Sequence, residues 1–265
     1  MNTKSRIASV GKGISLDTSI TGVPTFHLAQ LQWQEELDFP LPTNIRLGHL
    51  AEKIVSGCIK ASVHFKVLYE QVQILENQKT IGEIDFILEN QVDNELLHVE
   101  LAYKFYLYDP SISTESLQNW IGPNRNDSLI EKLDKLKNKQ FPLLYHSCTA
   151  AALNTIDIAS VAQVLCLVVS LFVPYGVKTK LAPAYEKAIK GYYLNFETFK
   201  DLDAPEKGYY IPSKKEWGMD ACEHEKWSSY QEVANQIQSS LHEKQSVLCW
   251  QKNGQTYLSF FIVWW

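Results

Sequence analysis

The chain has 265 residues, of which 45% are hydrophobic and 12% aromatic, and its 30 acidic and 25 basic residues give a formal net charge of −5. This composition excludes a chain that is disordered throughout and predicts a large folded domain. The negative charge excludes attraction of the whole molecule to a polyanion, so nucleic-acid binding would need a local basic patch.

The cysteines and the apolar runs bear on the location of the protein. Its five cysteines are widely spaced, odd in number and form no CxxC pair, which predicts a reduced protein without a zinc knuckle or disulfide framework. The longest apolar run, 161–173, contains Gln163 and Ser170 and is shorter than the ~20 residues that cross a bilayer. We therefore expect a cytoplasmic protein with no membrane span, and the oligomeric state stays open.

The first part of the chain predicts a leader, a helix and three strands. Residues 1–22 are rich in Ser, Thr, Gly and Lys, which predicts a mobile or loosely packed leader, and a short helix is expected over 27–37. Apolar residues at helical spacing predict a helix over 47–55. Alternating β-rich stretches predict strands over 65–75, 81–88 and 97–104, with a turn at 76–78 and a terminator at Asp109 and Pro110.

The second part predicts a helix, a central strand and a mixed region. A loop over 120–127 precedes an amphipathic helix from Leu129 to Leu136, and the Val- and Leu-rich run 161–173 predicts a central strand. Further on we expect a helix over 184–190, a strand over 208–211, a helix over 229–241, and a hairpin of 246–250 with 256–263. The aromatic tail 260–265 is too apolar for a free end, so we expect it to pack as a strand or to dock against a protein partner.

Two neighbouring strands each carry polar side chains on one face, because side chains alternate along a strand. The polar sets are Glu83 and Asp85 on the first strand, and His98, Glu100 and Lys104 on the second. Ile84, Phe86 and Leu88 are expected on the opposite face of the first strand. Pairing of the two strands would bring carboxylates beside an amine, and carboxylate oxygens suit a hard cation such as Mg²⁺.

The order helix, three strands, helix, strand, with Gly82 and Asp85 in the middle strand and Glu100 on the next, resembles the PD-(D/E)XK nuclease superfamily over residues 46–175. Within it, the runs 47–49, 82–86, 100–107 and 122–124 look like a family of uncharacterised bacterial proteins. The resemblance implies an α/β fold with a restriction-endonuclease-like α-β-β-β-α-β core over 46–177. That core would lie between a leader, 1–45, and a C-terminal α+β extension, 178–265.

Carried over to this chain, the resemblance implies that Asp85 and Glu100 bind Mg²⁺ or Mn²⁺, with Glu52 as the additional glutamate of the RecB-like branch. The superfamily's lysine usually follows the glutamate by two positions, where this chain has Ala102. Lys104 lies ~6–7 Å further along the same face and would act in its place. Three residues would support the ligands through hydrogen bonds, namely Glu83, His98 and His49.

Contacts to a nucleic acid would come from polar residues after the second strand, because phosphate contacts need mainly positive charge. They are Asn124, Arg125, Lys132, Lys135 and Lys139. Plainer interpretations stay open: His98 as a structural histidine of the sheet, His49 as a capping or packing residue, and the lysines as the solvated side of a helix.

These residues lead to the expectation of a Mg²⁺-dependent nuclease that hydrolyses phosphodiester bonds of DNA or RNA. An alternative is a catalytically inactive nuclease fold that binds a protein or a nucleic acid, as Ala102 and the negative net charge indicate. A third is an enzyme that uses the same carboxylates on a small phosphorylated molecule. The sequence alone does not separate the three.

Overall fold

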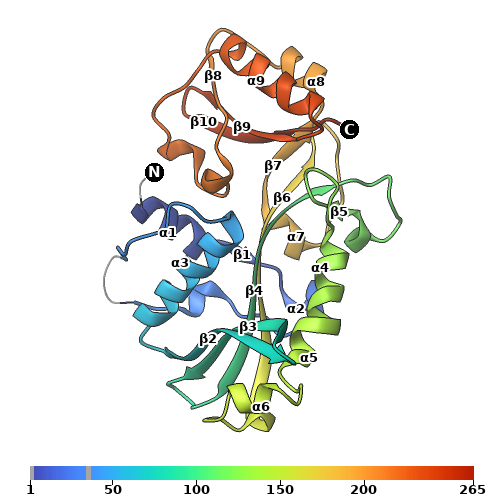
Figure 1. Cartoon of the computed structure of the whole chain (residues 1–265). Helices are drawn as coiled ribbons and strands as arrows, with labels where there is room; N and C mark the ends of the chain where they lie inside the picture. The colour runs from blue at the N-terminus through green and yellow to red at the C-terminus, as the bar shows by residue number, and fades with distance from the viewer. Residues whose placement is uncertain (1–2, 34–36) are drawn as a thin grey trace. The chain divides into compact units, whose positions relative to one another are not determined.

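The computed structural model describes residues 3–33 and 37–265 and confirms a mixed α/β fold (Figure 1). The chain divides into two compact units. Unit 2 contains Asn2–Lys104 and Glu131–Val169, and unit 1 contains Phe105–Ile130 and Ser170–Trp265. Whether the segments 1–45, 46–177 and 178–265 are domains stays a prediction. None of the helices in the described ranges is long and apolar enough to cross a membrane.

Unit 2 is built on strands in the order β2, β3, β4, β6. Strands β2 (Phe65–Glu76) and β3 (Lys79–Asn90) form an antiparallel hairpin, and β3 pairs antiparallel with β4 (Leu96–Tyr108). The hairpin turns at Asn77 and Gln78, whose φ angles of 48° and 64° suit a two-residue type I′ turn. The last strand, β6 (Val161–Pro174), also pairs with the short β1 (Ile14–Ser15). All four long strands confirm the sequence prediction.

The expected leader is packed, so that prediction was wrong. Residues 3–11 form helix α1 (Thr3–Gly11), and its Ile7 and Val10 are buried in one core cluster with Leu50 and Ile54 of helix α3 (Leu47–Ala61). Ile7 and Val10 are three residues apart and therefore face the same side of α1. The polar composition of the segment concealed this short apolar stripe. Helix α3 confirms the predicted helix and extends it to Ala61.

The predicted helix over 27–37 was also wrong in the part that is described, and residues 34–36 lie outside the described residues. Only the 3₁₀ turn η1 (Leu28–Gln30) forms there, and Phe26, Leu28 and Leu31 are buried in the core of unit 2. The other short helical elements of unit 2 are α2 (Thr18–Thr21), α5 (Phe141–Leu143), α6 (Thr149–Ala152) and η4 (Ile158–Ser160).

The apolar face predicted for β3 is only partly correct. Phe86 and Leu88 share a core cluster with helices α1 and α3, whereas Ile84 belongs to a second cluster with Ile74 and Leu143. The partner strand explains the difference, because β2 shifts register between Val67 and Tyr69 and has positive φ at Gln71. Such irregularities bend and twist a hairpin, so simple alternation fails near Asp85.

Unit 1 continues β4 and β6 and adds four strands in the order β7, β10, β9, β8 after β6. Strand β7 pairs parallel with both β6 and β10, whereas the pairs β10 with β9 and β9 with β8 are antiparallel. The strands are β7 (Ile189–Leu194), β8 (Lys207–Tyr210), β9 (Val247–Asn253) and β10 (Thr256–Ile262), and β5 (Trp120–Ile121) pairs with β4. Strand β8 and the C-terminal hairpin confirm the prediction.

The helices of unit 1 include one correction. Helix α9 (Tyr230–His242) confirms the prediction and packs with α8 (Phe196–Asp201) in a core around Phe199 and Ile237. The helix predicted over 184–190 is shorter, because α7 (Pro183–Glu186) ends before β7 begins at Ile189, in a Tyr- and Leu-rich stretch that favours a strand. The remaining short elements are η2 (Ser116–Asn119), η5 (Lys214–Glu216) and η6 (Ala221–Glu223).

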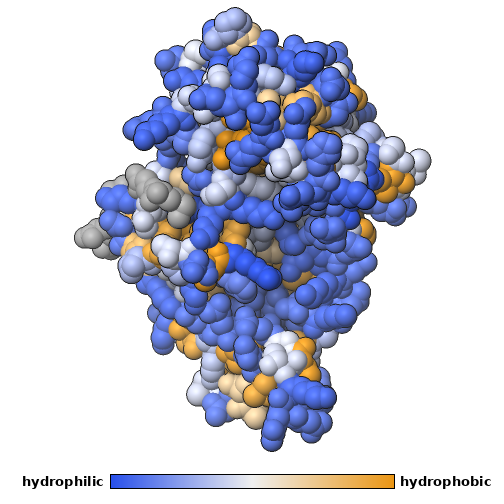
Figure 2. Space-filling model, turned by 45° about the horizontal axis from the view of Figure 1, so that its top comes forward, coloured by the Kyte–Doolittle hydropathy of each residue, from blue (hydrophilic) through white to orange (hydrophobic). Residues whose placement is uncertain are grey.

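The aromatic tail packs within unit 1, which was the first of the two expectations for it. Phe260 and Phe261 are buried in β10, and Trp265 donates a hydrogen bond of 3.1 Å to the carbonyl of Pro123. The face of the protein in Figure 2 is mostly hydrophilic, with hydrophobic residues in small patches. Scattered exposed apolar residues are normal on a protein surface. A protein partner for the tail stays a prediction.

Candidate functional site

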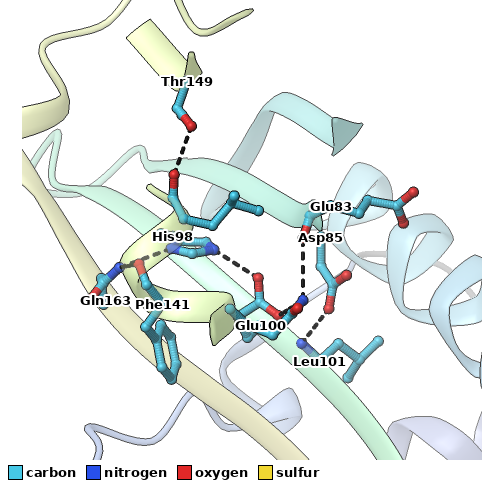
Figure 3. Close-up of polar contacts among 10 residues, drawn as sticks. Glu83, Asp85, His98, Glu100, Leu101, Phe141, Thr149 and Gln163 are labelled. Atoms are coloured by element: carbon cyan, nitrogen blue, oxygen red, sulfur yellow. Dashed lines mark hydrogen bonds and ion pairs between the residues drawn. The ribbon is translucent and has the colours of Figure 1, made fainter. Parts of the chain in front are cut away.

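Glu100 lies at the centre of a buried polar cluster in unit 2 (Figure 3). Its Oε1 lies 2.9 Å from Nε2 of His98, and its Oε2 accepts a hydrogen bond of 3.2 Å from the side-chain amide of Gln140. Glu100 is 1% exposed, and an isolated carboxylate at such a depth would be strongly destabilising. The surrounding donors therefore hold a carboxylate in a strand whose neighbouring side chains are apolar.

Gln140 is positioned by an irregular turn of a helix. Helix α4 (Leu129–Lys135), which fits the predicted amphipathic helix, continues as the π-helical segment η3 (Leu136–Gln140). The amide nitrogen of Gln140 also donates to the backbone carbonyl of Glu83 at 3.3 Å, so one side chain connects β3 with β4. Single π turns often lie at functional sites. Sequence analysis missed Gln140, because nothing in the local pattern separates it from the other polar residues of this helix.

Asp85 lies beside Glu100 and accepts a hydrogen bond of 2.8 Å from the backbone N–H of Leu101 through Oδ2. Burial, and next the charge of Glu100, raise the pKa of Asp85 to about 8, although the Leu101 hydrogen bond acts in the opposite direction. The charge of Glu52 raises this pKa further, and Lys132 lowers it. Ionisation of both carboxyl groups at once is therefore unfavourable without a further positive charge beside them.

Glu52, on helix α3, is the third carboxylate of the cluster. Its Oε2 lies 3.0 Å from Nδ1 of His49 and accepts a long hydrogen bond of 3.5 Å from Gln71, which in turn accepts one of 2.6 Å from Lys53. Gln71 has a φ of 51°, a left-handed conformation that is uncommon inside a strand and often found at functional sites. Glu100 and Glu52 thus both lie within electrostatic range of Asp85, and His49 contacts Glu52. Joint binding of a metal by the three carboxylates stays a prediction.

Lys132, on helix α4, is the basic residue that comes closest to the role of a site lysine. Burial, and next the charge of Lys104, lower the pKa of Lys132, whereas the charges of Asp85 and Glu100 raise it. These effects put its ammonium group within electrostatic range of both carboxylates and of Lys104. The sequence predicted Lys132 only as a phosphate contact. Lys135 and Lys139 are exposed, as expected for the polar side of this helix.

Ala102 stands where the superfamily that the sequence resembles usually has a lysine. Ala102 is 6% exposed and supplies no amine. Lys104 is partly exposed, and its charge acts on Lys132. A contact of Lys104 with substrate stays a prediction.

His98 and Glu83 were both expected to support the metal ligands through hydrogen bonds, but only the side chain of His98 contacts one of these ligands. His98 is fully buried, and its Nδ1 lies 3.2 Å from the side-chain amide nitrogen of Gln163. The carboxylate of Glu83, in contrast, extends away from Glu100, and only its backbone carbonyl takes part in the cluster (Figure 3). Sequence analysis missed Gln163 as a site residue, although a polar residue that interrupts an apolar strand signals a buried polar partner.

Asn124 and Arg125 belong to unit 1, where both have contacts of their own. Asn124 accepts a hydrogen bond of 2.7 Å from the backbone of Ser246. Arg125 lies 3.1 Å from Asp109, and its guanidinium lies 4.4 Å from the centre of the Trp265 ring. These contacts stabilise a loop of unit 1, and a role for either residue in binding nucleic acid stays a prediction.

Glu76, His146 and Cys148 form a separate cluster in unit 2, with potential ligand atoms within 4.8 Å of one another. The backbone N–H of Cys148 donates to Nδ1 of His146 at 3.3 Å, which puts the proton of a neutral ring on Nε2. Nε2 is also the nitrogen that faces Glu76, at 3.8 Å from its Oε1. A protonated nitrogen has no lone pair for a metal, so the arrangement is typical of a histidine beside a carboxylate.

The protein is thus of the mixed α/β class, and in unit 2 Asp85 and Glu100 lie within electrostatic range of Lys132. The chain belongs to the family described as Domain of unknown function (DUF1853), whose model matches residues 26–256. The match includes every carboxylate and lysine of the cluster. No curated protein and no solved structure matches the chain.

Proposed function

We propose that unit 2 binds a divalent cation, Mg²⁺ or Mn²⁺, and hydrolyses phosphodiester bonds of DNA or RNA, in the manner of the PD-(D/E)XK nucleases that the sequence resembles. The observation that carries this proposal is the position of Asp85, hydrogen-bonded to the backbone next to the buried Glu100 and within electrostatic range of it and of the half-buried Lys132. A perturbed carboxylate with a specific charged partner is a recognised sign of a functional site.

The donor set fits a hard cation. The side chains of Asp85, Glu100 and Glu52 offer only oxygen atoms, which Mg²⁺ prefers over nitrogen or sulfur. Each ionised carboxylate oxygen has two lone pairs, so an oxygen that accepts a hydrogen bond from Gln140 or Leu101 can also ligate a cation. The cation would supply a water of lowered pKa and neutralise charge on the phosphoryl oxygens.

The lysines would act on the phosphate itself. An ammonium group with a lowered pKa in a partly buried position stabilises developing negative charge more strongly than one in water. Lys132 has this environment, and Lys104 lies within electrostatic range of it. We therefore assign the contact with the scissile phosphate to Lys132, supported by Lys104. Lys135 and Lys139 would bind neighbouring phosphates through charge alone.

Purified protein incubated with Mg²⁺ or Mn²⁺ and with single- and double-stranded DNA and RNA tests this proposal. We expect cleavage that chelation abolishes and that Asp85→Asn and Glu100→Gln reduce below detection. Absence of cleavage by the wild-type protein on all substrates, or cleavage that both variants retain, would contradict it. Hydrolysis of small phosphodiesters without cleavage of polymers would instead indicate the small phosphorylated substrate considered above.

A binding role without catalysis is the second candidate, and one observation favours it. Ala102 is buried at the position where the superfamily has its lysine, so the usual amine is missing from the strand. In this case the protein would bind nucleic acid or a protein partner without cleaving it. Binding of a labelled oligonucleotide that Lys132→Ala weakens, together with no cleavage under any metal condition, would support this second candidate.

A cytoplasmic location remains part of the proposal. All five cysteines are free, and three of them, Cys58, Cys166 and Cys249, are buried. Free thiols are typical of a reducing compartment. Fractionation of cells that express the tagged protein would test this, with recovery in the cytosolic fraction as the expected result.

A further inference from the structure

The side chain of His98 is held on both sides by polar groups, although it lies in the core of unit 2. It is 0% exposed, its Nε2 lies 2.9 Å from Glu100 Oε1, and its Nδ1 lies 3.2 Å from Gln163 Nε2. The ring of Phe141 meets the imidazole edge-on at 5.6 Å between ring centres. The imidazole is therefore fixed in position. The location of its proton decides whether Nε2 donates a hydrogen bond to Glu100.

Gln163, on β6, determines the location of that proton. Its Nε2 lies 2.7 Å from the backbone carbonyl of Phe141, and a carbonyl oxygen can only accept a hydrogen bond. This contact identifies Nε2 as the amide NH₂ group, which resolves the ambiguity between nitrogen and oxygen in a glutamine side chain. The same nitrogen lies 3.2 Å from Nδ1 of His98 (Figure 3), so the second hydrogen of the NH₂ group is available to that ring nitrogen.

An NH₂ group that donates to Nδ1 requires a lone pair on Nδ1. A neutral imidazole has one protonated nitrogen, so the proton lies on Nε2, which donates it to Glu100. The ring thus gives Glu100 a hydrogen bond without adding a positive charge. An imidazolium at this place would compete with a cation for the carboxylate.

We propose that Gln163 is a positioning residue of the carboxylate site, which holds His98 as the neutral Nε2–H tautomer and thereby orients Glu100 for a divalent cation. This inference rests on the proposed metal site. In it, the carbonyl of Phe141 on α5 holds Gln163 on β6, Gln163 holds His98 on β4, and His98 holds Glu100. Groups that hydrogen-bond to metal ligands commonly affect metal affinity by about 10- to 100-fold.

The first test measures the proton directly on the wild-type protein. Two-bond ¹H–¹⁵N correlation spectra report the protonation of each histidine nitrogen, and the His98→Gln variant assigns the signals of His98. We expect the Nδ1 resonance of His98 at the position of an unprotonated nitrogen and the Nε2 resonance at that of a protonated one. A protonated Nδ1 would overturn the proposal.

The second test measures Mn²⁺ affinity by isothermal titration calorimetry. Gln163→Leu removes the donor, and Gln163→Glu replaces it by an acceptor that favours a proton on Nδ1, so both variants should weaken Mn²⁺ binding by about 10- to 100-fold. Gln251→Leu is a matched control, because Gln251 is 4% exposed and donates to Tyr209 in unit 1. The control should cost stability in a thermal melt and leave Mn²⁺ affinity unchanged.

The outcomes separate this inference from the proposed function. Wild-type protein that binds Mn²⁺, loses binding in Asp85→Asn and keeps it in both folded Gln163 variants would overturn the role of Gln163 alone. Wild-type protein that does not bind Mn²⁺ would overturn the metal site and, with it, the orienting role. Should a Gln163 variant fail to fold, the spectrum of the wild-type protein still decides the tautomer.

Discussion

Two partly buried carboxylates, Glu216 in unit 1 and Asp85 in unit 2, have pKa values shifted in opposite directions. In unit 1, burial raises the pKa of Glu216, but hydrogen bonds from Ser213 and Tyr210 outweigh burial and lower it. In unit 2, Asp85 accepts one backbone hydrogen bond, and burial with the charge of Glu100 raises its pKa to about 8. A carboxylate that is fully supplied with donors stabilises the fold, whereas one that lacks compensation favours a cation.

The origin of the partners differs as well. Glu216 receives donors from Ser213, three residues earlier, and Asp109 receives two from Ser111, two residues later. The carboxylates of unit 2 come from α3, β3 and β4, and their partners include residues of the same elements and also Gln140 on η3 and Gln71 on β2. Local contacts of this kind cap turns in unit 1, whereas the cluster in unit 2 depends on the whole fold of that unit.

The largest expected effect follows from removing a carboxylate in each unit. Glu100→Gln should reduce Mn²⁺ affinity below detection, because it removes one of the two buried charges and offers Gln140 a competing donor. Glu216→Gln should leave Mn²⁺ affinity unchanged. Titration calorimetry measures both, with circular dichroism to verify folding. Equal losses in the two variants would remove the distinction between the units.

The next effect concerns the lysines of one helix. Lys132→Ala should reduce the rate of cleavage by about 100-fold, because it removes a charge that stabilises the transition state. Lys135→Ala, three residues further on the exposed side, should have only a small effect that added salt masks. Rates at saturating substrate compare the two variants. A similar decrease in both would indicate general phosphate binding and no special role for Lys132.

A smaller effect is expected in the stability of the metal-free protein as the pH rises. The folded pKa of Asp85 lies above its ordinary value of 3.8, so the folded state binds the proton more tightly than the unfolded state does. This contribution to stability is complete below that ordinary value and is lost as the pH rises towards about 8. Asp85→Asn should therefore melt several degrees higher than the wild type at pH 8 in the presence of chelator, and the gap should shrink at pH 5.

The smallest effect concerns a helix cap of unit 1. Ser229 and Glu232 form a capping box at the start of α9. Ser229→Ala should cost about 1 kcal/mol of the free energy of unfolding. Chemical denaturation measures this cost, and Mn²⁺ affinity should not change. A loss of Mn²⁺ affinity would show that the two units are coupled.

Much of the fold was predictable because its signals are local. The alternating pattern of β3 and β4, the turn at Asn77 and the stripe of α3 each depend on residues close in sequence. Helix α1 was not predicted, because its apolar stripe is short and set among polar residues. The packing of Ile84 in a second core cluster was not predicted, because it depends on irregularities in the partner strand β2.

The carboxylates of the candidate site could be predicted from the sequence, whereas most of the residues that contact them could not. Asp85 and Glu100 stand on adjacent strands, whose pairing follows from the short turn between them. Lys132, Gln140 and Gln163 reach the cluster through the packing of α4 and β6, and no spacing rule relates them to Glu100. Polar residues in or beside apolar runs, such as Gln163, are the one signal that could have indicated this network.

The most direct test of the carboxylate site is the anomalous scattering of a crystal soaked with Mn²⁺. A single strong peak in unit 2, ligated by side-chain oxygens of Asp85 and Glu100, is the predicted result. A crystal with no peak there, or with its only peak in unit 2 at Glu76 and His146, would contradict the central claim that Asp85 and Glu100 form a cation site.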